Sequence, residues 1–217
     1  MKPYTLHGYW RSSCSWRVRI ALHIKGIEFE HVSVHLVADG GHQHTEEYKR
    51  LNPMRQVPTL YDNTHNRALT QSLVILDYLD HMHPSPALYP SDPLSAMAVR
   101  AACETINSGI QPLQNLGVLQ QLEISFGADQ AAKSAWASHF IGRGFEALER
   151  SLDTTAGTYC FGDTVSAADV CLVPQIFGAL RFGVDMAKFP VLTRINDACK
   201  QLEAFQRADA AAQPDAQ

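Results

Sequence analysis

Residues 9–22 read YWRSSCSWRVRIAL, and this stretch decides the fold of the first part of the chain. It joins a strand-like segment at residues 4–9 to apolar residues at helical spacing from 16 to 25, where Gly26 ends the helix. A second strand-like segment covers residues 29–36. A strand, a helix and a second strand in this order predict a βαβ unit.

The α/β pattern continues beyond this unit as far as a proline-rich segment. The sequence predicts a short helix at 45–51, two short strands at 59–61 and 68–70, and a helix at 72–83. Four prolines then fall between Pro84 and Pro93. Proline cannot propagate a helix, so these residues indicate a linker.

Everything after the linker has apolar residues at helical spacing, in segments near 94–126, 128–152, 166–180 and 189–206. The last ten residues are small and polar, which is typical of a disordered tail. We therefore expect an α/β domain at 1–84, a linker at 85–92, an all-helical domain at 93–207 and a disordered tail at 208–217.

The composition is that of an ordinary globular protein, with 46% apolar and 18% charged residues among 217. A formal charge of −4 gives no reason to expect nucleic acid or an anionic membrane as a partner. No apolar stretch approaches the roughly 18–20 residues that span a bilayer, and the start lacks the apolar run of a secretory signal. We therefore expect a cytoplasmic protein.

Cysteines and histidines give no sign of a metal site. The five cysteines stand far apart without a C-x-x-C pair, which argues against a disulfide framework and against zinc. The histidine pairs 42/44 and 81/83 are two residues apart, and residues at that spacing on a helix do not face each other. We expect no bound metal, and only Cys14 has unusual neighbours.

Those neighbours are Ser12 and Ser13, which stand with Cys14 between Arg11 and the first predicted helix. A helix N-terminus presents unpaired N–H groups and a partial positive charge, so it stabilises an anion such as a thiolate. A single serine here would be interpreted as an N-cap. Three consecutive hydroxyl or thiol groups exceed what a cap needs, and we interpret them as a candidate catalytic centre.

A second signal lies at residues 52–60, NPMRQVPTL, together with Gln71 and Ser72 at the head of a helix. The Val57–Pro58 bond precedes a strand and is a candidate cis peptide, which would leave the Val57 backbone able to pair with an extended peptide ligand. Ser72 at a helix start offers a site for a small carboxylate. The order and spacing of these pieces favour a binding function over routine capping.

An α/β domain of this kind followed by an all-helical domain resembles a glutathione transferase, whose first domain is thioredoxin-like. The resemblance is specific for the zeta class, also known as maleylacetoacetate isomerases. It rests on blocks at residues 12–22, 52–59, 71–73, 110–116 and 168–185. These blocks span nearly the whole chain, so the resemblance covers both expected domains.

The resemblance implies glutathione as cofactor and assigns its binding to residues of both domains. The residues are Ser12, Ser13, Cys14, Ser15, Trp16, Arg17, His42, Val57, Gln71, Ser72, Gln111, Asn115, Leu116 and Gly117. Within this set, Val57 is expected to pair with the glutathione backbone, and Gln71 and Ser72 to hold its γ-glutamyl end. His42 and Gly117 depart from the family, which usually has glutamine and serine there.

The implied activity is cis–trans isomerisation of a small dicarboxylic keto acid such as maleylacetoacetate, in tyrosine and phenylalanine catabolism. Reversible addition of the glutathione thiolate would turn the double bond into a single bond, allow rotation and leave glutathione unconsumed. Arg11 and Arg181 are expected to bind the substrate carboxylates, because a guanidinium grips a carboxylate with two N–H groups. The family assembles as homodimers, which we expect here as well.

Other functions remain open from the sequence. The same thiolate could act on α-halo acids as a transferase or dehalogenase, or on maleylpyruvate. Relatives that use maleylpyruvate tend to carry His and Arg in the segment equivalent to 111–117, where this chain has no basic side chain. Cys14 could instead serve a thiol oxidoreductase, or the chain could be a non-catalytic binding module. The alternative interpretation of Arg181 is a surface ion pair with Asp185.

Overall fold

The structure, a computed structural model, describes residues 2–216 and divides into two compact units. One unit is formed by Met1–Leu88 together with Gln201–Gln217, and the other by Tyr89–Lys200. The division at Leu88 lies inside the proline-rich segment that predicted a linker.

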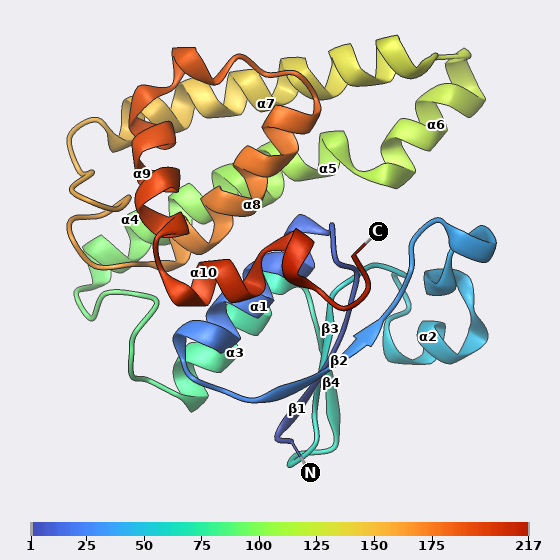
Figure 1. Cartoon of the computed structure of the whole chain (residues 1–217), viewed down its shortest axis with the longest axis horizontal. Coiled ribbons are helices and arrows are strands. Elements are labelled where there is room, and N and C mark those ends of the chain that lie inside the picture. Colours follow the sequence, from blue (N-terminus) through green and yellow to red (C-terminus); the bar gives the residue numbers. More distant parts are fainter. Residues whose placement is uncertain (1, 217) are drawn as a thin grey trace. The chain divides into compact units, whose positions relative to one another are not determined.

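A four-stranded sheet forms the centre of the first unit (Figure 1). Its strands are β1 (Tyr4–Gly8), β2 (Phe29–Ser33), β3 (Thr59–Asp62) and β4 (Arg67–Thr70), in the order β2-β1-β3-β4. β1 is parallel to β2 and antiparallel to β3, which is antiparallel to β4. The predicted βαβ unit and the thioredoxin-like class are therefore confirmed, although β2 ends at Ser33, three residues before the predicted end.

Two helices, α1 (Ser13–Ile24) and α3 (Ser72–Met82), pack against each other beside this sheet (Figure 1). A smaller helix, α2 (Glu46–Leu51), lies between β2 and β3 and follows two short 3-10 turns, η1 (Ala38–Gly40) and η2 (His42–His44). The core forms because apolar positions alternate in the strands and recur every three or four residues in the helices. Leu6, Ile20, Leu60 and Leu76 are all completely buried.

The second unit is helical, as predicted, with more breaks than the sequence pattern suggested. Its longer helices are α4 (Pro93–Glu104), α6 (Leu116–Phe126), α7 (Gln130–Leu152), α8 (Ala167–Arg181) and α9 (Pro190–Lys200). The segment expected as one helix at 94–126 also contains a π-helical turn, η3 (Thr105–Ile110), and a single turn, α5 (Gln111–Gln114). The break has a local cause, since Asn115 is extended and caps α6.

The chain after α9 differs from the sequence expectation. α10 (Glu203–Ala208) and the 3-10 turn η5 (Ala210–Ala212) belong to the α/β unit, where α10 packs against α1 (Figure 1). Residues 201–207 therefore do not continue the helical domain, and residues 208–216 are folded. Ala208 and Ala210 are buried. Small side chains suggested disorder, but here Ala208 lies close enough to α1 for its carbonyl to accept a hydrogen bond from Arg19 Nε at 3.1 Å.

Across residues 2–216, no helix is both long enough and apolar enough to cross a membrane.

Candidate active site

The candidate site lies where β1, β3 and β4 meet at one edge of the sheet. His7, next to the end of β1, is paired with Thr59, the first residue of β3, and Thr59 is paired with Thr70, the last residue of β4. The residues that follow β1 and β4, and the residues that precede β3, therefore lie at the same edge. This register brings together the two sequence signals, residues 12–14 and residues 57 with 71–72.

α1 begins at this edge with an intact N-cap. Ser12 is extended and its Oγ accepts a hydrogen bond from the Ser15 amide at 3.2 Å, while the Ser12 amide donates to the Tyr9 carbonyl at 3.0 Å. Ser12, Ser13 and Cys14 are all half-buried, and the first turn contains no acidic side chain. The positive end of the helix is therefore available to stabilise an anion.

Cys14 differs from the other cysteines in its exposure. The other four thiols are buried, and burial raises the pKa of both Cys160 and Cys199. A thiol must ionise to react as a nucleophile, so these buried cysteines are unreactive. Cys14 is the half-buried thiol that lies at a helix N-terminus.

The next three predicted residues, Ser15, Trp16 and Arg17, have buried side chains. Ser15 Oγ accepts a hydrogen bond from the Tyr9 amide at 3.3 Å. Arg17 Nη1 donates to Ser72 Oγ at 3.1 Å, which ties α1 to the start of α3. Because the protein itself covers these side chains, we interpret them as residues that position the site, not as side chains that contact a ligand.

The start of α3 has the features of a carboxylate site. Gln71 has φ +66°, a backbone conformation that residues other than glycine rarely adopt. Within the described residues, its side chain makes no capping hydrogen bond. Ser72 follows and is only 4% exposed. The first-turn amides of α3 therefore lack the side-chain oxygen that Ser12 supplies to α1, and an anionic ligand group would satisfy them.

The predicted cis bond before β3 is confirmed, whereas ligand pairing by Val57 stays a prediction. The Val57–Pro58 peptide bond is cis. Val57 is half-buried, and the ladder of β3 begins only at Thr59, so Val57 lies outside it. Its position beside the paired strands suits an extended ligand backbone.

His42 is connected to Tyr9 by ring contacts through His35. Its ring lies 6.2 Å from that of His35, which lies 5.0 Å from that of Tyr9, three residues before Ser12. His42 Nε2 is also 3.3 Å from Asp39 Oδ2 on the exposed side. His42 is thus separated from the turn that leads into α1 by the ring of His35.

The remaining predicted residues include Arg11, which is half-buried with its guanidinium 5.3 Å from the Trp10 ring. The others belong to the helical unit: Gln111 is buried at the start of α5, and Asn115, Leu116 and Gly117 are exposed at the start of α6. Arg181 is exposed at the end of α8, with its guanidinium 5.0 Å from the Phe182 ring. Asp185 caps the 3-10 turn η4 (Met186–Lys188) by accepting from the Ala187 amide.

Two charged residues beside the site were missed by sequence reasoning. Arg19 and Asp215 hold the backbone of the turn before Ser12, at Tyr9 and Trp10. Arg19 stands between the apolar residues Val18 and Ile20 on the buried face of α1 and is completely buried. A charge in such a position indicates a buried partner, but sequence alone does not say that the partner is distant by 189 residues.

Comparisons with known proteins agree with this geometry. Residues 11–82 match the family model described as glutathione S-transferase, N-terminal domain. The rat protein maleylacetoacetate isomerase is 50% identical over 214 residues, which cover 99% of this chain and 95% of that protein.

Two solved structures are similar over nearly the full length. The holo structure of a maleyl pyruvate isomerase, described as a bacterial glutathione S-transferase in the zeta class, has a TM-score of 0.93, 40% identity, and coverage of 98% of this chain and 100% of that chain. Maleylacetoacetate isomerase from Anaeromyxobacter dehalogenans, with bound dicarboxyethyl glutathione and citrate in its active site, has a TM-score of 0.87, 40% identity and full coverage of both chains.

The first unit is thioredoxin-like, and two helices begin at one edge of its sheet, beside a cis-proline segment. Together with a helical second unit, these features define the class of glutathione transferases. Within this class, the chain belongs to the zeta-class family of maleylacetoacetate isomerases.

Proposed function

We propose that this protein is a glutathione-dependent cis–trans isomerase of a small dicarboxylic keto acid such as maleylacetoacetate, acting in tyrosine and phenylalanine catabolism. The proposal rests on one observation above all: α1 and α3 both begin at the sheet edge where β1, β3 and β4 meet. Two positive helix ends there suit a tripeptide with a thiol in its middle and a carboxylate at its end. The full-length relatedness to maleylacetoacetate isomerases supports the same activity.

The described residues fit glutathione. The uncapped first turn of α3, with Gln71 and Ser72, would hold the γ-glutamyl carboxylate, and Val57 would pair with the peptide backbone. His42 would contact the glycine end, a role that the family resemblance suggests; its ring packs against His35, which packs against Tyr9. The start of α1 would then face the central thiol.

Bound glutathione supplies a thiolate that adds reversibly to the substrate double bond and so permits rotation about it. A free thiol has a pKa of about 8.5 and is mostly protonated at neutral pH, so the protein must favour the ionised form. The N-terminus of α1 does this through its dipole, and the Ser12 or Ser13 hydroxyl through a hydrogen bond. Cys14 is not required as the nucleophile in this scheme.

Arg11 and Arg181 are our candidates for binding the substrate carboxylates. If Arg181 does so, Arg181→Ala should lower kcat/KM about tenfold to a hundredfold, mainly through KM, and leave glutathione affinity unchanged. Arg181→Lys should recover only part of this loss, because lysine supplies the charge without the planar fork. Unchanged steady-state constants for the alanine variant would remove Arg181 from the site.

The central experiment follows the loss of maleylacetoacetate absorbance with no thiol, with glutathione and with S-methylglutathione. We expect turnover only with glutathione, and no loss of free thiol as the keto acid is consumed. S-methylglutathione should inhibit, because it can occupy the site without ionising. Stoichiometric loss of thiol would indicate conjugation and would contradict the isomerase assignment.

Maleylpyruvate is the second candidate substrate, favoured by the structural similarity to a maleyl pyruvate isomerase. The absence of a basic side chain at residues 111–117 favours maleylacetoacetate. Comparing kcat/KM for the two keto acids decides between them.

We also propose that the protein acts as a homodimer and resides in the cytoplasm. The five cysteines are all free thiols, which suits a reducing compartment.

A further inference from the structure

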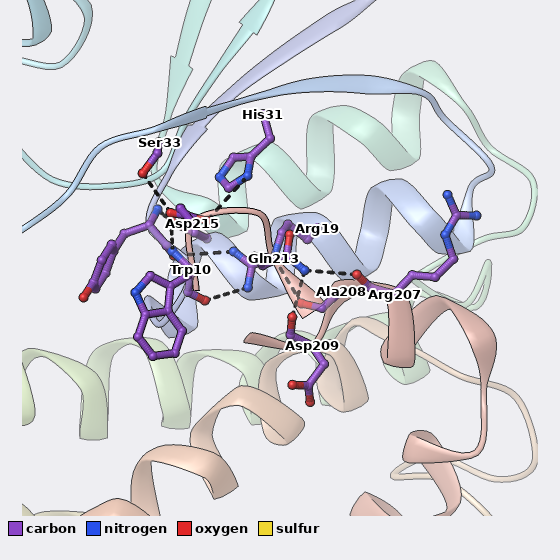
Figure 2. A network of polar contacts seen from close by, with 11 residues as sticks. Trp10, Arg19, His31, Ser33, Arg207, Ala208, Asp209, Gln213 and Asp215 are labelled. Carbon is purple, nitrogen blue, oxygen red and sulfur yellow. Dashed lines mark hydrogen bonds and ion pairs between the residues drawn. The ribbon is translucent and has the colours of Figure 1, made fainter. Parts of the chain in front are cut away.

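The turn before Ser12 is held by two charged side chains, Arg19 of the adjoining helix α1 and Asp215, which is 205 residues from Trp10 in sequence (Figure 2). The Trp10 amide donates to Asp215 Oδ2 at 3.2 Å, and the Trp10 carbonyl accepts from Arg19 Nη2 at 2.8 Å. The Tyr9 carbonyl accepts from Arg19 Nη1 at 3.4 Å as well as from the Ser12 amide at 3.0 Å. Both polar groups of the Trp10 backbone are therefore fixed two residues before Ser12.

Asp215 is itself held in place on several sides. Its Oδ2 also accepts from Ser33 Oγ at 2.8 Å, its Oδ1 lies 3.8 Å from His31 Nδ1, and its side chain is 13% exposed. Gln213 fixes the segment that leads to it, because Gln213 Nε2 donates to the carbonyls of Arg207 and Asp209 at 3.0 and 2.8 Å (Figure 2). Asp215 thus joins the end of β2 to the turn.

Arg19 ties the same turn to α10. Its guanidinium is completely buried and its Nε donates to the Ala208 carbonyl at 3.1 Å. Burial lowers the pKa of Arg19 to about 10, while Asp215 and Asp209 oppose that shift, so Arg19 keeps its charge at neutral pH. A buried cation with three bonds to backbone carbonyls is costly to move, so it fixes the turn more firmly than a neutral side chain would.

We propose that Arg19 and Asp215 are positioning residues for the reaction: they fix the turn at residues 9–12 and thereby the hydrogen-bond geometry of Ser12 toward the thiol. This inference rests on the proposed function. A donor stabilises a developing or bound anion only when it is placed within a few tenths of an ångström, so a turn held from both sides preserves the donor's effect. The C-terminal segment therefore acts on the site without contacting substrate.

The test compares Asp215→Ala, Asp215→Asn and the control Glu203→Ala in the full-length protein. Glu203 lies on the same segment, is exposed and pairs with Arg207, so the control removes the same charge away from the turn. Two properties are measured against pH: kcat/KM for maleylacetoacetate, and the ultraviolet absorbance of the thiolate of enzyme-bound glutathione.

For Asp215→Ala we expect the apparent pKa of the bound thiol to rise by about one unit and kcat/KM at neutral pH to fall about tenfold, since one unit corresponds to a tenfold change in ionisation. Asp215→Asn should remain within about threefold of the wild type, because its amide oxygen can still accept from the Trp10 amide. Glu203→Ala should match the wild type in both measurements.

A loss of kcat/KM that is equal at every pH, with an unchanged thiol pKa, would show a purely structural role and overturn the inference. So would an Asp215→Ala variant with wild-type behaviour. If the wild type itself neither isomerises the keto acid nor lowers the thiol pKa of glutathione, the proposed function fails first. Thermal melts of all variants separate these results from loss of folded protein.

Discussion

The Ser12 hydroxyl can serve the helix and a thiolate at the same time. It accepts a hydrogen bond from the Ser15 amide, and a serine hydroxyl keeps one proton to donate. Capping and catalysis therefore do not compete at this residue. The same proton is the group that would stabilise a thiolate at the start of α1.

Ser12→Ala should consequently lower kcat/KM about a hundredfold, the scale of losing one donor to a developing anion. Cys14→Ala should lower it far less, because Cys14 is not the nucleophile. The lost cap costs about 1 kcal/mol of unfolding free energy, which leaves the protein folded at 25 °C. Steady-state kinetics of both variants, with thermal melts as controls for folding, test these expectations. An inactive Cys14→Ala variant together with a nearly normal Ser12→Ala variant would favour a thiol oxidoreductase.

Gln71 offers a test in which stability and binding change in opposite directions. Its φ of +66° is strained for glutamine, so Gln71→Gly should raise the unfolding free energy by about 0.5–1 kcal/mol. The same change should weaken glutathione binding about tenfold, because the amide side chain that would hold the γ-glutamyl end is lost.

The matched control for Gln71→Gly is Asn66→Gly, in the turn between β3 and β4, where φ is +53°. Urea unfolding measures the stability of both variants, and glutathione titration measures their affinity. The affinity of Asn66→Gly should be unchanged. Tighter or equal binding by Gln71→Gly would exclude Gln71 from the ligand site.

At the scale of single elements, the sequence predicted what depends on local chemistry. The strand, serine cap and apolar spacing at residues 4–25 determine β1 and α1 within a few residues, and the start of α3 was placed correctly. The breaks at 105–115 were missed because a π-helical turn keeps apolar residues near helical spacing. Periodicity cannot separate such a turn from a continuous helix.

The positions of the candidate site residues in the fold were predictable for the same reason. The buried contacts that hold these residues in place were not. Ser12, Val57 and Ser72 stand at helix or strand ends that carry short-range signals. By contrast, Arg17 was predicted to bind glutathione, and the structure shows its side chain buried against Ser72. The contacts of Arg19 with Ala208 and of Asp215 with Trp10 depend on tertiary packing between residues far apart in sequence.

His23, near the C-terminal end of α1, should make the stability of the protein depend on pH in the acidic range. Burial, aided by Arg207 and Arg19, lowers the pKa of His23 to about 4, below an unfolded value of about 6.5. The unfolded chain therefore binds more protons between these values, and stability falls as the pH falls through this window. By pH 5 the unfolding free energy should have fallen by about 1 kcal/mol through His23, after allowance for the half-exposed ring.

Urea unfolding at pH 7 and pH 5 measures this effect. His23→Gln should lose less stability between the two conditions than the wild type, because glutamine does not titrate. His44→Gln, at an exposed position in η2, provides the control and should follow the wild type. An equal pH dependence in all three proteins would contradict the prediction.

At the scale of the whole molecule, the proposed homodimer would cover apolar side chains that a single chain leaves in water. Met54 and Val74 of the α/β unit are 64% and 55% exposed, and Leu94 and Met97 of the helical unit are 72% and 62% exposed. The family packs the first domain of one chain against the helical domain of the other, so each pair would find a partner. Burying such residues is favourable by about 1.5 kcal/mol or more each.

Sedimentation equilibrium should therefore give a mass of twice 24.0 kDa at micromolar concentration. Met97→Asp should shift the equilibrium toward the single chain, because a charge would be buried in the contact. Ile124→Asp, an equally apolar and exposed position on α6, should leave the mass unchanged. A wild-type mass near 24.0 kDa would contradict the homodimer.

The inclusion of residues 201–217 in the first unit has a consequence for biosynthesis. Topologically, the helical unit is an insertion within the α/β unit. A ribosome exposes the sheet and α1 early, but Ala208, Asp209 and Asp215, which bind Arg19 or offset its charge, are translated only after the helical unit, after a delay on the order of ten seconds. During that interval the nascent α/β unit carries an incompletely partnered cation in its interior. We expect the nascent first unit to become resistant to protease only after residues 201–216 have left the ribosome.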